Sequence, residues 1–205
     1  MTTAAKRTDW LRLNRRGVGS RDRIVDAAIE VFTAQGYHGT TLAAIAERAG
    51  ITDSGLLYHF GSKAELFAMV VQLREEPLQL AFSPPPATFD ELVDAAVDAV
   101  RATLERPELV RFQAAVAGEL MQPGHPFHAH AIDTQRLGTT LVARALGDFK
   151  RAGQLRADVD PRQLASEFIA LHRGLRFEWA TSPDRLDLAA CFETAVRRLA
   201  DAVRA

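Results

Sequence analysis

The chain has 205 residues, of which 47% are hydrophobic, and its formal net charge is −1 at pH 7. That length can bury the cores of one large or two modest domains, but no apolar run is long enough to cross a membrane. A single cysteine, Cys191, excludes an internal disulfide and a cysteine-rich zinc site, and the basic N-terminus lacks the apolar stretch of a signal peptide, so we expect a cytoplasmic protein.

The charge is distributed unevenly along the chain. Residues 1–25 contain seven Lys and Arg residues against two Asp residues, whereas the rest contains 18 basic against 24 acidic residues. A basic arm on an acidic body is typical of proteins whose arm binds DNA phosphates. We predict that residues 1–19 form such an arm, disordered in the free protein. The alternative is a solvated tail with no role in binding.

Residues 41–60 contain two short helical patterns with a single glycine, Gly50, between them. Apolar residues of the first pattern recur at helical spacing, and Gly50 can adopt the left-handed conformation that ends a helix. Thr52 can then cap the second helix, whose length suits the major groove of DNA. We predict a helix-turn-helix in which the second, recognition helix has an apolar underside formed by Ile51, Leu56, Leu57 and Phe60.

Helical patterns also flank this pair. Ser62 and Glu65 have the spacing of a capping box, which predicts that a fourth helix begins there. Before the pair, residues 21–36 predict an amphipathic helix that ends at Gly36. Its apolar face is formed by Ile24, Ala28, Val31 and Phe32.

Prolines indicate where the first domain ends. Pro77 is predicted to end the fourth helix, and residues 84–86 are three consecutive prolines, which exclude a helix. We therefore predict a DNA-binding domain over residues 20–80, with its motif at about 41–60, and a regulatory and dimerisation domain over residues 81–205.

The first four helical patterns carry a characteristic set of residues. In chain order these are Ile24, Ala27, Ala28, Phe32, Gly36, Tyr37, Thr41, Ile45, Ala46, Ala49, Gly50, Ile51, Thr52, His59, Phe60, Ser62, Lys63 and Leu66. The set covers roughly the first third of the chain and resembles the tetracycline-repressor (TetR) family of bacterial transcriptional regulators. The chain departs from the family pattern at Leu57, where an aromatic residue is usual, and at Asp53, where a basic or neutral residue is common.

The resemblance implies which side chains contact DNA. Thr41 and Lys63, each at a helix start, are expected to contact phosphates. Tyr58 and His59, near the end of the recognition helix, are expected to contact phosphate or sugar. Thr52, Ser54 and Gly55, at its beginning, are expected to lie nearest the base edges. Asp53 either stabilises the helix dipole or accepts a hydrogen bond from a cytosine amino group. The predicted DNA-binding residues are Thr41, Thr52, Asp53, Ser54, Gly55, Tyr58, His59 and Lys63.

The second half of the chain is also predicted to be helical. Its helix starts are marked by capping residues, by prolines in a first turn or by a preceding loop. They lie near Thr88, Pro107, Phe127, Asp160 and Asp187. Because strand signals are absent throughout, we predict an all-α fold of about nine helices.

Large apolar residues are concentrated in two successive helices of this half, near residues 112–137. They form either a solid core or the lining of a cavity for a largely hydrophobic effector, with a few polar groups that orient it. The residues predicted to bind this ligand are Phe112, Gln113, Val116, Met121, Phe127, His128 and His172. For His172, an ordinary interface histidine is the alternative.

Three histidines, His125, His128 and His130, lie within six residues of one another. The spacing of the last two suits a strand better than a helix, and no further Asp, Glu or Cys ligands are evident nearby. We therefore predict no metal site and no cofactor. Because no catalytic motif occurs either, we do not expect an enzyme.

The last two helices carry apolar stripes that allow two interpretations. The stripes either belong to the core of the protomer or form a dimer interface, and the TetR resemblance implies dimerisation through these helices. The residues predicted for the dimer interface are Leu164, Phe168, Leu171, Leu175, Phe192, Ala195 and Leu199.

Together these features predict a DNA-binding transcriptional regulator. We expect a ligand-responsive repressor that binds a pseudo-palindromic operator in double-stranded DNA as a homodimer. A transcriptional activator and a regulator without an effector are alternatives within this class. A helical enzyme or carrier with a vestigial DNA-binding head is the alternative from another class.

Overall fold

The computed structural model describes residues 19–81 and 84–205, and of residues 74–81 it describes the backbone alone. In chain order the helices are α2 (Ser20–Gly39), α3 (Leu42–Ala49), α4 (Asp53–Phe60), α5 (Lys63–Ala81), α6 (Phe89–Thr103), α7 (Pro107–Leu120), α8 (His128–Arg151), α9 (Pro161–Thr181), a short 3-10 helix η1 (Pro183–Arg185) and α10 (Leu188–Val203). The prediction of an all-α fold with about nine helices is confirmed for these residues. None of the described helices is both long and apolar enough to cross a membrane. Except for Gly19, the predicted basic arm lies outside the described residues.

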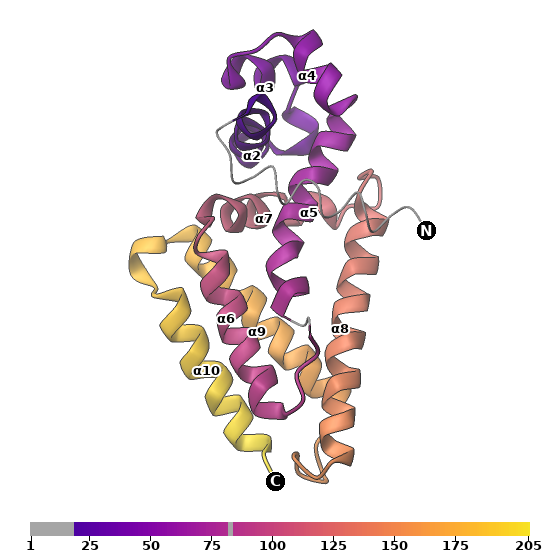
Figure 1. Ribbon diagram of the computed structural model, residues 1–205, viewed down its shortest axis with the longest axis vertical. Coiled ribbons are helices and arrows are strands. Elements are labelled where there is room, and N and C mark those ends of the chain that lie inside the picture. The colour runs from indigo at the N-terminus through magenta and orange to yellow at the C-terminus, as the bar shows by residue number, and fades with distance from the viewer. Residues whose placement is uncertain (1–18, 82–83) are drawn as a thin grey trace. The chain divides into compact units, whose positions relative to one another are not determined.

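The chain divides into two compact units between Val71 and Gln72. In the first unit, α2 packs against α3 and α3 against α4 (Figure 1). Its core contains the predicted apolar face of α2, the ring of Tyr37 in the last turn of α2 and the ring of Phe67 on α5. The ring centre of Phe67 lies 4.9 Å from that of Tyr37 and 5.0 Å from that of Phe32. The first unit is therefore built around the helix that precedes the helix-turn-helix.

Two helix ends in the N-terminal half differ from prediction. Gly36 has a φ of 69°, which interrupts the helical path, and one more turn follows before α2 ends at Gly39. The predicted end of the fourth helix at Pro77 is wrong, because α5 continues to Ala81. A proline removes one backbone hydrogen bond, which can kink a helix without ending it.

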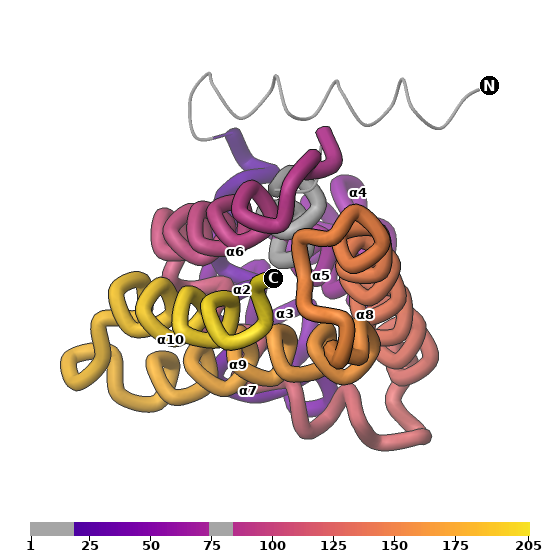
Figure 2. Tube along the Cα trace, turned by 90° about the horizontal axis from the view of Figure 1, so that it is seen from below, coloured from indigo at the N-terminus to yellow at the C-terminus, as the bar shows by residue number. Residues whose placement is uncertain are grey.

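The second unit is a bundle of α6 to α10. Figure 2 shows α6 beside α10 and α8 beside α9, and α9 also packs against α7 and α10. The described core of this bundle is formed mainly by α6, α9 and α10, with contributions from α7 and α8. Its largest buried members are Phe89, Leu92, Leu146, Phe149, Leu164, Phe168, Trp179, Leu188 and Phe192.

Local capping explains where these helices begin. The Thr88 hydroxyl accepts a hydrogen bond from the Glu91 amide (3.1 Å), and the Asp160 carboxylate accepts one from the Arg162 amide (2.8 Å). At α10, the Asp187 carboxylate accepts from the Ala190 amide in the same way. Each bond satisfies a backbone donor that the first turn leaves unpaired, so the predicted starts are confirmed.

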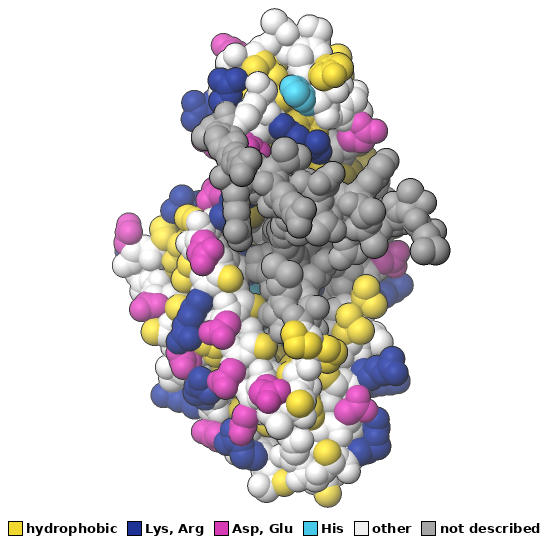
Figure 3. Space-filling model, in the orientation of Figure 1, with side chains coloured by type: hydrophobic (Ala, Val, Ile, Leu, Met, Phe, Trp, Pro, Cys, Tyr) yellow, Lys and Arg dark blue, Asp and Glu magenta, His cyan; other side chains and the backbone are white. Residues whose placement is uncertain are grey.

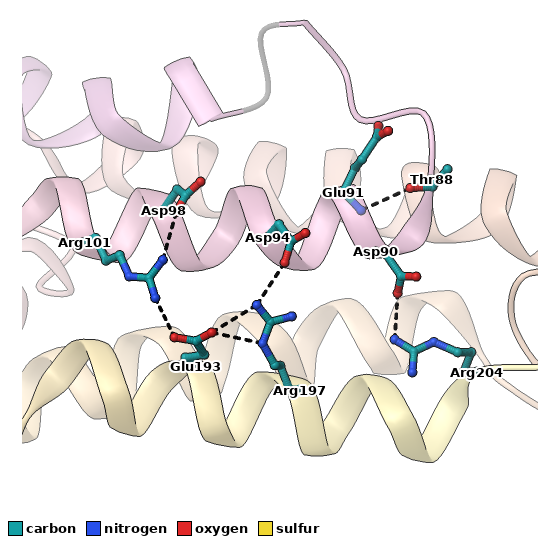
Figure 4. Close-up of polar contacts among 9 residues, drawn as sticks. All are labelled: Thr88, Asp90, Glu91, Asp94, Asp98, Arg101, Glu193, Arg197 and Arg204. Atoms are coloured by element: carbon teal, nitrogen blue, oxygen red, sulfur yellow. Dashed lines mark hydrogen bonds and ion pairs between the residues drawn. The ribbon is translucent and has the colours of Figure 1, made fainter.

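A ladder of ion pairs joins α6 to α10 along one exposed face (Figure 4). Hydrogen bonds to Glu193 and Asp94 raise the pKa of the Arg197 guanidinium above its ordinary value. Exposed pairs of this kind contribute little stability one by one, but as a set they favour one register of the two helices. The pairs are Asp94–Arg197 (3.0 Å) and Arg101–Glu193 (2.6 Å) between the helices, and Asp90–Arg204 (2.6 Å) at the residue that follows α10.

Candidate nucleic-acid interface

The turn between α3 and α4 is built as the sequence predicts. Gly50 has a φ of 68°, the left-handed conformation that few other residues adopt without strain. The amide after it, that of Ile51, donates to the Ala46 carbonyl (3.0 Å), which closes the end of α3. The Thr52 hydroxyl then accepts from the Gly55 amide (3.2 Å) and begins α4. These few residues fix the direction in which the recognition helix leaves the turn.

Helix α4 presents a mixed outer face. Leu56 and Phe60 are buried, whereas Thr52, Asp53, Ser54 and His59 are exposed, and Tyr58 is 88% exposed. Figure 3 shows a histidine, hydrophobic side chains and Lys or Arg side chains exposed together on the described part of this unit. The predicted polar residues of α4 are therefore accessible to a partner.

One predicted orientation on α4 is wrong. Leu57 was expected in the apolar underside, but its side chain is 44% exposed. Leu56 and Phe60 are four residues apart and define the buried stripe, and Leu57 lies about 100° around the helix from Leu56. Leu57 and Phe60 are three residues apart and also fit one face of a helix, so spacing alone does not place Leu57 outside.

Gly55 is half-buried, and its small size protects the helix cap. A Cβ atom at this position would lie 3.3 Å from the Thr52 hydroxyl oxygen, the atom that caps α4. A larger residue would therefore disturb the cap as well as any contact with a base. Ser54 is the better position at which to test base contacts, because among the described residues its exposed hydroxyl hydrogen-bonds to the Thr52 hydroxyl alone (3.1 Å).

Lys63 ties the first residues of α5 to the turn after α2. Its ammonium donates hydrogen bonds to the carbonyls of Tyr37 and Thr40, each at 2.9 Å, and lies 4.5 Å from the centre of the Tyr37 ring. The Thr40 carbonyl belongs to a buried residue, so it needs such a partner. An ammonium has three donors, which leaves one for the phosphate contact that the resemblance implies. Sequence reasoning missed the tie because its partners lie 23 and 26 residues away.

Thr41 has a local role of its own at the start of α3. Its hydroxyl accepts a hydrogen bond from the Ala44 amide (3.1 Å), and the residue is exposed. On the same helix, Arg48 forms an ion pair with Glu30 of α2, which offsets its charge. The residues predicted for phosphate and base contacts are therefore the N-caps of α3 and α4, residues of α4 itself and the first residue of α5. Two of them, Tyr58 and His59, are neighbours on α4, with their ring centres 5.5 Å apart.

The residues predicted to bind an effector are only partly brought together. Phe112 and Val116 are buried on α7, and the side-chain oxygen of Gln113 is buried with no hydrogen-bond partner among the described residues. Met121, by contrast, is 47% exposed at the end of α7, so it does not line a closed cavity in this structure. It is the residue that follows the last turn of the helix.

The predicted histidines and Phe127 lie in two places. His128 contacts the Leu120 carbonyl through Nδ1 (3.0 Å), and the ring of His125 accepts from the Phe127 amide, so these residues order the α7–α8 connection. His172 packs edge-on against Phe192 of α10, with the two ring centres 5.8 Å apart, so it contacts the core of its own protomer. Among the residues that the structure describes, no three His, Cys, Asp or Glu side chains are grouped to hold a metal ion.

The residues predicted for the dimer interface include the core of the protomer itself. Leu164 and Phe192 are 2% exposed and Phe168 is 7% exposed, so these side chains belong to the core of the protomer, the first of the two interpretations of the stripe. Partly buried residues of the same stripe pack against this core: Leu171, Leu175 and Leu199. A stripe at helical spacing marks burial, but it does not tell whether the covering surface belongs to the same chain.

Other faces of α9 and α10 are accessible. On α9, Gly174 is exposed and the large apolar side chain of Phe177 is 58% exposed. On α10, an open groove is lined by Leu186, Asp187, Ala190, Cys191, Thr194, Ala195 and Arg198. Ala195, one of the predicted interface residues, thus lines an open groove.

Comparison with known proteins identifies the family. Residues 24–70 match the family model for bacterial regulatory proteins of the tetR family. The HTH-type transcriptional regulator TtgR of Pseudomonas putida is 30% identical over 185 residues, covering 82% of this chain and 84% of that protein. The chain belongs to the TetR family. It is a DNA-binding transcriptional regulator, as the sequence predicts.

Other TetR-like proteins match along most of their length. The HTH-type transcriptional regulator SrpR of Pseudomonas putida is 29% identical over 169 residues, covering 81% of this chain and 78% of that protein. The structure of NalD, the secondary repressor of the MexAB-OprM multidrug efflux pump in Pseudomonas aeruginosa, superposes with a TM-score of 0.69 at 25% identity, covering 90% of this chain and 96% of that one. A SmeT–triclosan complex superposes with a TM-score of 0.72 at 22% identity, covering 91% and 92%, and shares the fold.

Proposed function

We propose that this TetR-family regulator is a repressor that binds a pseudo-palindromic operator as a homodimer. The observation that carries the proposal is the capped recognition helix α4, whose outer face is exposed while its inner face is anchored by Leu56 and Phe60. One such helix covers too few base pairs for a unique site, whereas two heads about 34 Å apart would match successive major grooves. NalD, at 25% identity, is described as a repressor, which supports the same role here. We place the protein in the cytoplasm, where its operator DNA lies.

In this proposal the exposed residues of the head have distinct roles. Thr41, Tyr58, His59 and the free donor of Lys63 contact phosphate or sugar and position the head. Contacts to the DNA backbone set affinity and register, and contacts to base edges set sequence preference. The residues nearest the base edges are Thr52, Asp53, Ser54 and Gly55.

The dimer forms, in this proposal, through the exposed surfaces of α9 and α10. Gly174 has open space where a side chain would lie, so a second backbone can approach there, and Phe177, three residues later on the helix, supplies a large apolar contact. Burial of an aromatic side chain is among the strongest contributions to an interface. The small residues that line the α10 groove, Ala190, Thr194 and Ala195, are compatible with close helix packing.

An electrophoretic mobility assay with DNA from upstream of the protein's own gene tests the regulator. We expect one retarded complex that survives an excess of unrelated DNA, because base contacts add to the phosphate term that all sequences share. A promoter–reporter fusion then separates repressor from activator by the sign of the change when the protein is expressed. Absence of sequence-specific binding even at low salt would favour a helical enzyme or carrier.

The buried oxygen of Gln113 supports a small-molecule effector. An unpartnered buried acceptor costs stability, and a ligand that donates a hydrogen bond would remove that cost. Phe112 and Val116, both fully buried and one helical turn apart on the same helix, supply apolar surroundings. The fold can hold such a molecule, since SmeT shares it and was solved with triclosan. We therefore infer a largely hydrophobic effector with one hydrogen-bond donor.

Gln113→Leu is expected to weaken the response to effector while operator binding persists. Leucine preserves much of the volume and removes the acceptor, so stability should be unchanged or slightly higher. Release of a fluorescent operator by triclosan and by a panel of hydrophobic phenols measures the response, and we expect about tenfold more compound to be needed. Gln135→Leu, at an exposed position on α8, is the control. Equal responses of Gln113→Leu and the original protein would contradict the assignment of Gln113.

A further inference from the structure

The recognition helix carries an exposed aliphatic side chain that the proposed contacts do not use. In the first unit, the large hydrophobic side chains that are exposed among residues 19–71 are Leu57 (44%) and Tyr58 (88%), and both lie on α4. A single exposed leucine is ordinary on a protein surface. Here, however, both of the large exposed apolar side chains lie on the helix that faces DNA in the proposed function, next to the residues expected at the base edges.

Leu57 is held in a defined position. Its carbonyl accepts a hydrogen bond from the Gly61 amide (2.7 Å), so it lies within the last regular turn of α4. It lies three residues after Ser54 and four after Asp53, and on a helix residues at these spacings lie on the same face. Asp53 and Ser54 are exposed, whereas the inward positions are occupied by Leu56 and Phe60. Leu57 therefore shares the outer face of α4 with Asp53 and Ser54.

The chemistry of this face limits what it can recognise. Helix α4, Asp53–Phe60, contains no Lys or Arg, so it lacks the side chains that most often read guanine in the major groove. Asp53 and Ser54 can bond to amino groups or acceptors of the bases. An aliphatic side chain has one complementary feature among the base edges of the major groove, the C5-methyl group of thymine.

We propose that Leu57 reads a thymine methyl group in each half-site of the operator. The inference rests on the proposed function, in which α4 enters the major groove. Burial of one methyl group between Leu57 and the base would exclude water from both apolar surfaces, and cytosine, which lacks the methyl group, would not provide this contact. Leu57 is thus a specificity-determining residue at the position where the family pattern usually has an aromatic side chain.

The experiment begins with selection of duplexes from a random pool by the full-length protein. In the enriched duplex, each thymine is then replaced in turn by deoxyuridine, which removes only the methyl group. At one thymine per half-site, we expect this replacement to weaken binding of the original protein about fourfold, and about fifteenfold when both half-sites are changed. Leu57→Ala should bind the thymine duplex about as weakly as the original protein binds the uracil duplex, and should bind both duplexes equally.

Controls separate this contact from changes in folding. Leu57→Met keeps an aliphatic side chain and should retain the preference for thymine, whereas Leu57→Gln should lose it. Leu137→Ala, at an exposed leucine on α8, should leave it intact. Circular dichroism melting checks that each variant is folded, and the exposed position of Leu57 predicts little change.

The outcomes distinguish the two levels of the proposal. If no sequence is enriched, the proposed function itself fails. If a sequence is enriched but uracil is tolerated at every thymine, the assignment of Leu57 is overturned. The same holds if Leu57→Ala and the original protein lose the same affinity on uracil substitution. In both cases the proposed function as a sequence-specific regulator is retained.

Discussion

Phe177→Glu is expected to convert the protein from a dimer to a monomer without unfolding it. The side chain is 58% exposed in the protomer, so its replacement leaves no cavity in the core of the second unit. In the proposed interface, the change would place an unpaired carboxylate of each protomer in an apolar seam, which is strongly unfavourable. Light scattering after size exclusion should report half the mass, and operator affinity should fall about 100-fold or more because the two heads no longer bind as one ligand.

Two further variants make this test specific. Leu137→Glu places the same charge at a leucine that is 60% exposed on α8, and it should remain dimeric. Phe168→Glu places the charge in the core of the protomer, where the side chain is 7% exposed, and it should lower the melting temperature or prevent folding. A monomeric Phe177→Glu variant with full operator affinity would contradict the dimeric mode of binding. If the Phe177→Glu variant remains a dimer, the dimer interface lies on another surface of the protein.

The features predicted correctly from the sequence are local. The caps at Thr52, Thr88 and Asp160 depend on a side chain and an amide two or three residues away, and the turn at Gly50 depends on one residue's φ. Such interactions can be identified from spacing alone, because the backbone of a first turn always leaves donors unpaired. The helix-turn-helix consists of several such local interactions in succession, which is why its residues also carry the family resemblance.

The features that the sequence did not disclose depend on the partner surface. Phe168 and Phe177 are both aromatic residues on α9, but the first faces the core of its own protomer and the second faces outward. The periodic stripe detected Phe168 because cores are continuous and apolar. The proposed dimer interface, which combines Phe177 with glycine and alanine, has no such period. Leu57 was misplaced for a related reason, since a short helix of eight residues allows two overlapping apolar stripes.

Lys63→Ala is expected to affect both the stability of the DNA-binding unit and its affinity for every DNA sequence. The ammonium donates to the carbonyls of Tyr37 and Thr40, and hydrogen bonds from a charged donor contribute about 1.5–3 kcal/mol. Loss of the tie should therefore lower the melting temperature and loosen the turn between α2 and α3. Loss of the charge should lower the slope of log affinity against log salt by about one unit for each head, if the remaining donor contacts a phosphate.

Lys63→Arg separates the two roles. Arginine keeps the positive charge, so the salt slope should stay near that of the original protein. Its planar guanidinium, however, cannot donate to the two carbonyl groups with the same geometry as the ammonium. The melting temperature of this variant should therefore lie between those of the original protein and Lys63→Ala. If Lys63→Ala lowers the melting temperature but leaves the salt slope unchanged, Lys63 holds the turn through its two carbonyl bonds and does not contact a phosphate. A lower salt slope with an unchanged melting temperature would show that the two carbonyl bonds contribute little to holding α5 against the reading head.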